Sequence, residues 1–274
     1  MDEVDYISGE TRLFAIVGHP IQQVRSPEMV TAELKSRGWN AILVPFDVIP
    51  EDFATSLPCL MRMPNLDGLI FTIPYKQAAC SLVSDLGVQA KQVGAINAAV
   101  RSHGGRWIGE IFDGIGCVEA FRRRGLDFKD RRVMLVGAGG AGRAIAVAIA
   151  HQNPASMRIF DVDRQRGEAL VQTVAAINRD IIAQFGAPQL HDVDFLLNAS
   201  PVGMLNDPRC PVDASQIRDN IVVFDAIVKP EATALLTIAG QRGCRTILGR
   251  EMMRGQISKI VDYFASEGEG FAAR

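Results

Sequence analysis

Short apolar runs alternate with amphipathic stretches along the first half of the chain. Strands are expected at 13–17, 41–44 and 68–71, and a helix is expected at 27–37. Residues 94–100 and 106–108 flank a turn at 103–105 and indicate an antiparallel pair of strands. This alternation predicts an α/β domain with a mixed sheet.

A regular strand–helix rhythm follows the charged stretch at 122–132, which a helix enters and where it ends near Gly125. Strands are expected at 132–136, 157–160, 195–198, 221–225 and 246–248, with helices at 143–150 and 164–177. Repeated βαβ units with right-handed crossovers predict a parallel, doubly wound sheet of the Rossmann type. Residues 249–274 predict a last helix, since apolar residues from Met252 to Phe264 recur at helical spacing.

A glycine-rich turn, GAGGAG at 137–142, separates the expected strand 132–136 from its helix. Its glycines fit the GxGxxG spacing, in which backbone N–H groups and a helix dipole face a pyrophosphate. A plain tight turn is the alternative, because such turns also use glycine. The residues expected to bind a dinucleotide here are Gly137, Gly139, Gly140, Ala141 and Gly142.

The end of the strand at 157–160 bears on the choice of cofactor. Asp161 lies 19 residues beyond Gly142 (161 − 142), near the position of the acid that binds a ribose 2′-hydroxyl. A carboxylate there repels a 2′-phosphate, which favours NAD over NADP. NADP stays open, because Arg164 or Arg166 could reach such a phosphate, and Asp161 could also be a solvated turn residue.

Composition narrows the class of protein. A length of 274 residues suits two domains, and a net charge of −2 with a pI near 6.1 gives no basic field for nucleic acid or an anionic membrane. The acidic first ten residues do not resemble a signal peptide, and no apolar run approaches the ~20 residues that span a bilayer. Five scattered cysteines indicate structural thiols in a reducing cytoplasm, and four histidines without ligand spacing suggest no metal site.

Several polar residues fall at expected strand ends or loop corners, where open α/β sheets bind ligands. They are Ser26, Thr72, Lys76, Asn97 and Asp113. Each has a purely structural alternative. Ser26 could be the N-cap of a helix that starts at Pro27, Lys76 a surface lysine, Asn97 a turn residue and Asp113 a cap.

Taken in order, these residues and their neighbours resemble the shikimate/quinate dehydrogenase family over about residues 14–256. The matching motifs are GHPIQQVRSP (18–27), TIPYK (72–76), GAIN (94–97), DGIG (113–116), GAGGAG (137–142), NASPVGM (198–204), KPEATALLTIAGQRG (229–243) and GREMMRGQ (249–256). The resemblance implies a substrate and catalytic domain at 1–112 and 249–274 around an NAD(P)-binding domain at 113–248. It also implies a soluble enzyme of aromatic amino acid biosynthesis, a monomer or homodimer.

The resemblance also implies roles for single residues. Lys76 and Asp113 match the catalytic lysine and its aspartate partner. Ser26, Thr72, Asn97 and Gln256 match residues that bind the substrate, a ring polyol such as shikimate or quinate. Asn198, Ser200, Gly249 and Met253 match elements of the nicotinamide pocket.

The implied chemistry is the oxidation of a secondary alcohol, with hydride passing to NAD or NADP and the hydroxyl proton passing to a Lys–Asp pair. Which member carries the proton stays open, because coupled groups titrate together. The alternative function is a non-catalytic NAD(P)-dependent ligand sensor that keeps the fold.

Two departures from the family pattern affect the expected carboxylate pocket. Val24 stands where the family has a serine, and Val228 where it has a tyrosine. In the family these two hydroxyls hold the substrate carboxylate, and each lost bond to a charged group is worth roughly 1.5–3 kcal/mol. We therefore expect an altered substrate or weak activity with shikimate, unless Arg25 or Ser26 compensates.

Overall fold

The computed structural model of the protein describes residues 7–22, 24–205 and 207–268. The chain folds into two compact units. The first comprises the residues up to Phe112 together with those from Ile257, and the second comprises Asp113–Gln256. Within the described ranges, no helix has the length and apolar character needed to cross a membrane.

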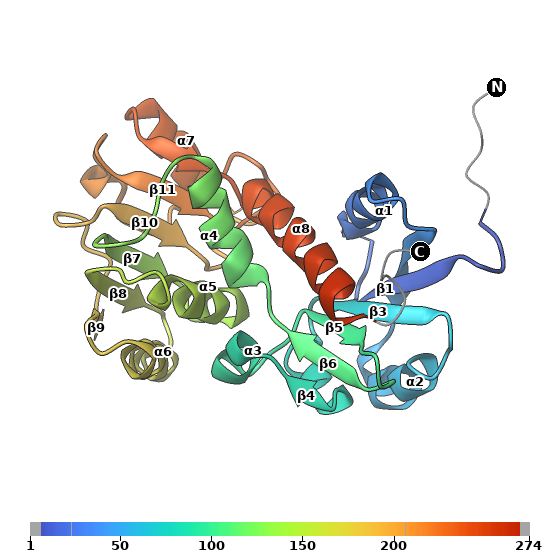
Figure 1. Cartoon of the computed structure of the whole chain (residues 1–274). Coiled ribbons are helices and arrows are strands. Elements are labelled where there is room, and N and C mark those ends of the chain that lie inside the picture. The colour runs from blue at the N-terminus through green and yellow to red at the C-terminus, as the bar shows by residue number, and fades with distance from the viewer. Residues whose placement is uncertain (1–6, 23, 206, 269–274) are drawn as a thin grey trace, which may run out of the picture. The chain divides into compact units, whose positions relative to one another are not determined.

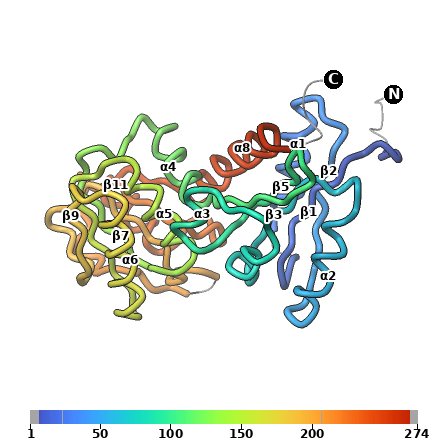
Figure 2. The backbone as a smooth tube through the Cα atoms, turned by 60° about the horizontal axis from the view of Figure 1, so that its bottom comes forward, coloured from blue at the N-terminus to red at the C-terminus, as the bar shows by residue number. Residues whose placement is uncertain are grey.

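The first unit is a six-stranded mixed sheet with short helices (Figures 1 and 2). Its strands are β1 (Arg12–Gly18), β2 (Ala41–Asp47), β3 (Leu66–Phe71), β4 (Asp85–Leu86), β5 (Ala98–Arg101) and β6 (Trp107–Glu110). Its helices are α1 (Ser26–Ser36), α2 (Phe53–Leu60) and α3 (Val88–Val93), with 3₁₀ turns η1 (Pro50–Asp52) and η2 (Ala78–Leu82). The strand order is β2-β1-β3-β5-β6-β4, parallel from β2 to β3 and antiparallel from β3 through β5 to β6. The predicted mixed sheet and antiparallel pair are confirmed.

Helix α2 was not predicted, because Pro58 lies inside it and disfavours a helical conformation at the preceding residue. Phe53 and Leu57 nevertheless bury their side chains in the same cluster as Phe71 and Tyr75. This burial outweighs the local preference. Through this cluster, the segment that follows β2 packs against the loop that follows β3.

The second unit is the predicted doubly wound sheet, and all its strand pairs are parallel. Its strands are β7 (Arg132–Val136), β8 (Ser156–Phe160), β9 (Ile182–Phe185), β10 (Phe195–Asn198), β11 (Val222–Asp225) and β12 (Arg245–Ile247). Its helices are α4 (Asp113–Arg123), α5 (Gly140–Ala150), α6 (Arg164–Ile177) and α7 (Ala234–Gln241), with a 3₁₀ turn η3 (Ala214–Gln216). The order β12-β11-β10-β7-β8-β9 reverses direction between β7 and β10, which is where such sheets bind ligands (Figure 1).

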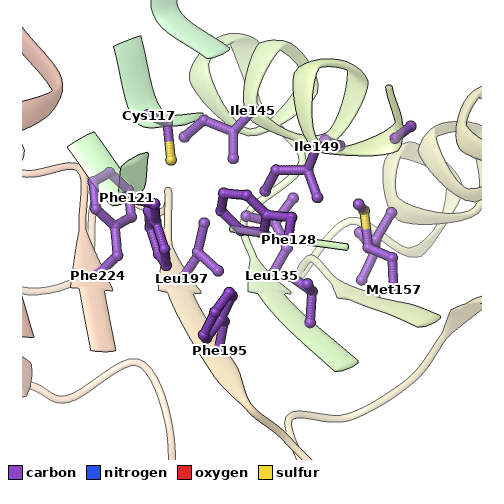
Figure 3. Close-up of a cluster of buried hydrophobic side chains, with 14 of the residues drawn as sticks. Cys117, Phe121, Phe128, Leu135, Ile145, Ile149, Met157, Phe195, Leu197 and Phe224 are labelled. Carbon is purple, nitrogen blue, oxygen red and sulfur yellow. The ribbon is translucent and has the colours of Figure 1, made fainter. Parts of the chain in front are cut away.

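An aromatic cluster joins the sheet of the second unit to the helices on one of its faces (Figure 3). Phe121 of α4 lies 4.5 Å from Phe128, 5.1 Å from Phe195 and 6.0 Å from Phe224, measured between ring centroids. These side chains are almost fully buried. This packing therefore fixes the positions of the central strands and of the loops that follow them.

The last helix, α8 (Gly249–Glu267), belongs to both units. Its first turns pack closely on the second unit, because a Cβ at Gly249 would lie 2.5 Å from the carbonyl oxygen of Ile227. Its later residue Phe264 stacks on Phe14 of β1 at 4.7 Å. The compact second unit therefore ends at Gln256, within the helix, rather than at the expected residue 248. Residues 269–274, where the helix was expected to continue, lie outside the described residues.

Candidate functional site

The loop after β7 depends on glycine at two positions. Gly137 has a φ of +103°, and a Cβ there would lie 2.6 Å from the backbone nitrogen of Ser200. A Cβ at Gly142 would overlap the carbonyl oxygen of Gly137. Because neither side chain exists, the chain turns at the end of β7 and enters α5 at once, with Gly139 as the N-cap.

The start of α5 has the properties of an anion site. Nothing lies within 4 Å of the Cβ positions of Gly139 and Gly140, so a bulky group can approach the backbone there. The first N–H groups of a helix have no partner within the helix and attract negative charge. An 11-residue helix entered from a parallel strand in this way fits a dinucleotide pyrophosphate.

Asp161 follows β8 and is 9% exposed. Its carboxylate accepts hydrogen bonds from the backbone N–H of Ala138, at 2.7 Å, and of Asp163, at 2.8 Å. The structure therefore brings Asp161 to the glycine loop, as its sequence position predicted. These two hydrogen bonds fix Asp161 beside the glycine loop, so it is not a solvated turn residue.

The two arginines that could meet a 2′-phosphate have partners of their own. Arg164 donates to Glu168 at 2.7 Å and lies over the ring of Phe185. Arg166 pairs with Asp163 at 3.5 Å.

The end of β10 supplies a second part of the same region. Asn198 is fully buried, and its Oδ1 accepts bonds from the backbone N–H and the hydroxyl of Ser200, at 3.0 and 2.7 Å. Its Nδ2 donates to Asp225 at 3.1 Å, and Asp225 also accepts from Thr233. Burial raises the pKa of Asp225. Sequence reasoning missed Asp225 and Thr233, although the last residue of a parallel strand is a position where a polar side chain signals a site.

Gly249 and Met253 lie on the first turns of α8, within the second unit. A Cβ at Gly249 would also lie 2.7 Å from the carbonyl oxygen of Ala226, directly after β11. The structure therefore places the start of α8 at the end of β11.

In the first unit, the structure brings Thr72, Lys76 and Asn97 to one sheet edge. The N–H of Thr72 donates to Val17 at 3.0 Å, and the carbonyl of Lys76 accepts from the N–H of Ile96 at 2.8 Å. Asn97 is 1% exposed, and its carbonyl accepts from the N–H of Phe71 at 2.8 Å. The loop that carries Lys76 is therefore fixed to the residue before Asn97.

Tyr75, whose side chain is buried, also holds this loop in place. Its hydroxyl donates to the carbonyl of Val48, and its ring stacks on Phe53 at 4.2 Å. Burial raises the pKa of Tyr75. Sequence reasoning missed this residue, because the bond to Val48 depends on the position of the chain after β2.

The N-cap reading of Ser26 is wrong. The structure gives Arg25 as the N-cap of α1 and Ser26 as the first helical residue, with Pro27 next. Helix α1 starts one residue earlier than the pattern indicated. The hydroxyl of Ser26 is thus not required as a cap, and a ligand role stays a prediction.

Asp113 and Gln256 meet within the second unit. The Nε2 group of Gln256 donates to Oδ1 of Asp113 at 2.9 Å, and Asp113 is 5% exposed. Glycine allows the contact, since a Cβ at Gly116 would lie 2.6 Å from the carbonyl of Met252 and 2.9 Å from Cβ of Gln256. This pairing, between residues 143 positions apart, was not predicted.

Comparisons with known proteins show which family this chain belongs to. The family model described as the shikimate dehydrogenase substrate binding domain matches residues 16–99, which lie in the first unit. A shikimate dehydrogenase (NADP(+)) of Thermococcus kodakarensis is 33% identical over 247 residues, 89% of this chain and 87% of the relative.

Solved structures share the fold over nearly the whole chain. Shikimate 5-dehydrogenase from Listeria monocytogenes, in complex with shikimate and NAD, has a TM-score of 0.88 and 27% identity, with 96% of this chain and 95% of that chain covered. The ligand-free 5-ketofructose reductase of a Gluconobacter strain has a TM-score of 0.84 and 26% identity, with 95% of each chain covered.

The glycine loop gives a direct test of the anion site. Gly142→Ala should destabilise the protein by about 1–3 kcal/mol or more and abolish dinucleotide binding, because its Cβ overlaps Gly137. Gly139→Ala should leave the melting temperature nearly unchanged and still weaken binding, because its methyl group occupies the open approach. Differential scanning calorimetry and titration calorimetry with NADH measure both effects. Equal dinucleotide binding by Gly139→Ala and wild type would contradict the site.

Proposed function

Because the chain belongs to the shikimate dehydrogenase family of NAD(P)-dependent oxidoreductases, we propose that it interconverts a ring secondary alcohol and its ketone, with Lys76 and Asp113 as the acid–base pair. The substrate is a polyhydroxylated ring carboxylate, such as shikimate or quinate, or a close analogue. The observation that carries the proposal is the fixed loop of Lys76, bound through its carbonyl to the residue before Asn97.

The proposed division of labour follows the two units. The glycine loop, Asp161, Asn198, Ser200 and the start of α8 hold the dinucleotide. A bound nicotinamide supplies the hydride acceptor when the alcohol is oxidised. Thr72 and Asn97 orient the ring, with Ser26 and Gln256 as further substrate contacts.

Side chains of the protein transfer the proton. The Lys76–Asp113 pair accepts the hydroxyl proton as the carbonyl forms and returns it in the reverse direction. The bond from Gln256 fixes one oxygen of Asp113, which keeps this carboxylate in one orientation. A non-catalytic sensor has no use for such a pair.

Loss of either member of the pair should slow the chemical step. Lys76→Ala and Asp113→Asn should each lower kcat by about 10²-fold or more, as for removal of a proton-transfer group. Circular dichroism and NADH binding should stay close to wild type. Near-normal turnover by both folded variants would rule out the assignment.

The cofactor we propose is NAD. The relative from Thermococcus is named for NADP(+) and the Listeria complex holds NAD, so the comparisons establish only a nicotinamide dinucleotide. Two local features support NAD. Asp161 places a carboxylate beside the glycine loop, and Arg164 and Arg166 are paired with Glu168 and Asp163.

The kcat/KM of the wild-type protein should therefore be higher with NAD than with NADP. Asp161→Ala should narrow the difference, because the variant removes the repulsion of a 2′-phosphate along with a partner of the ribose. Arg164→Ala, at the first residue of α6, serves as the control and should leave the ratio of the two kcat/KM values unchanged. A wild-type preference for NADP would show that an arginine overrides the carboxylate.

Within this substrate class, we propose an altered substrate or weak activity with shikimate. Val24 and Val228 replace two hydroxyls of the family pattern, and Val228 is 40% exposed. The Gluconobacter relative, named as a 5-ketofructose reductase, supports a change of substrate on this fold. The residues proposed for the hydroxyl side of the ring are retained.

The double variant Val24→Ser with Val228→Tyr should lower KM for shikimate. Rebuilt hydrogen bonds act in the ground state and the transition state alike, so kcat should change less. Steady-state kinetics with shikimate measure the split, and Val228→Phe in place of Val228→Tyr separates the hydroxyl from the bulk of the ring. Tight shikimate binding by the wild-type protein would point to another carboxylate partner, such as Arg25.

The function as a whole is tested by NAD(P)H absorbance with a panel of ring polyols. The panel contains shikimate, quinate, an aminated shikimate analogue and uncharged cyclohexane polyols, each offered with NAD and with NADP. We expect turnover of at least one ring alcohol, with shikimate a weak substrate. Dinucleotide binding without turnover of any of them would contradict the proposal and favour a sensor.

A further inference from the structure

One half-buried carboxylate of the first unit has no part in the function described so far. Glu110 is the last residue of β6, two residues before the end of the first unit at Phe112. Its Oε1 accepts the backbone N–H of Ile111 and the backbone N–H of Ala90, each at 2.7 Å. The carboxylate therefore joins the start of α3 to the turn that follows β6.

The same turn controls Asn97. The N–H of Asn97 donates to the carbonyl of Glu110 at 3.0 Å, and the N–H of Phe112 donates to Oδ1 of Asn97 at 2.8 Å. An N–H group can donate only to the oxygen of an amide, so the orientation of the Asn97 side chain is determined. An acceptor oxygen that binds this amide must do so at Nδ2. A substrate bound there must offer an acceptor oxygen.

We infer that Glu110 is a positioning residue for substrate binding, which holds the 110–112 turn so that Asn97 presents its amide N–H₂ to the ring. The inference rests on the proposed function, because it assumes that Asn97 binds the substrate. Glu110 touches no substrate itself. It acts through the N–H of Ile111 and, one residue on, the N–H of Phe112.

The residues around Glu110 leave space for its carboxylate. A Cβ at Gly87 would overlap Oε2 of Glu110, so glycine is needed for the side chain to reach α3. Burial raises the pKa of Glu110, against the lowering effect of the backbone N–H groups and of the charge of Lys91. Tyr263 also faces the site, and its ring lies 5.2 Å from that of Phe112.

The test compares variants with the ring alcohol that the wild-type protein turns over best. Glu110→Ala should raise KM for this substrate about tenfold, the factor expected when one hydrogen bond to the substrate is lost, while kcat changes less than about threefold. Glu110→Gln should restore KM to within about twofold of wild type, because an amide oxygen can accept from Ile111 and Ala90. Gly87→Ala displaces the carboxylate from the other side and should also raise KM, even if Glu110→Ala does not fold.

Asp67→Asn is the matched control. Asp67 is a 3% exposed carboxylate of the same unit, on β3, and accepts from Arg12 at 2.7 Å. This variant should lose stability without a change in KM. Amide hydrogen exchange should show faster exchange at Phe112 in Glu110→Ala and unchanged exchange there in Asp67→Asn.

The outcomes separate the two proposals. A wild-type protein that turns over no ring alcohol would contradict the proposed function. An active wild type with unchanged KM in both Glu110→Ala and Gly87→Ala would overturn this inference alone and leave Glu110 a purely structural residue. A raised KM in Glu110→Gln equal to that of Glu110→Ala would also overturn it, since the acceptor is retained.

Discussion

The second unit depends on a packing constraint inside the loop 137–142. The carbonyl oxygen of Gly137 occupies the place that a side chain at Gly142 would need, and the chain between β10 and α7 presses against Gly137 at Ser200. Only glycine satisfies both contacts. Because of them, α5 begins directly at the end of β7, and its N-terminus faces the point where the sheet changes direction. Asp161, which follows β8, then accepts a hydrogen bond from Ala138 of the same loop, while Asn198 at the end of β10 holds Ser200, whose backbone nitrogen lies against Gly137.

In the first unit, the candidate site residues are positioned in a different way. Backbone hydrogen bonds hold the loops that carry them, and side chains from other parts of the unit fix these loops in turn. Tyr75 fixes the loop of Lys76 by a bond to the chain after β2, and Glu110 fixes the turn beside Asn97. The position of a candidate site residue therefore depends on the turn that carries it as well as on its own rotamer.

Local patterns in the sequence predicted much of the fold, and long-range contacts explain what they missed. The strands 132–136 and 195–198 were predicted with their observed bounds, because they are continuous apolar runs of a sheet covered on both faces. Strand β9 was missed, since it is a four-residue edge strand whose residues are exposed or half-buried and do not form the continuous buried run of the central strands. In the candidate site, the spacing from the glycines predicted that Asp161 lies beside the glycine loop, where it accepts from Ala138; its role in binding stays a prediction. The bond between Gln256 and Asp113 was not, because it depends on how two helices cross at Gly116.

We propose that this chain brings a ring alcohol, a Lys–Asp pair and a nicotinamide dinucleotide together for hydride transfer. A crystal structure of the ternary complex with NAD and the best ring alcohol, captured in the Lys76→Ala variant, tests it most directly. We predict the pyrophosphate at Gly139 and Gly140, the adenosine ribose on Asp161, and the reacting hydroxyl within hydrogen-bonding distance of Asp113. A ring alcohol bound away from Asp113, or a dinucleotide bound away from the glycine loop, would contradict the account.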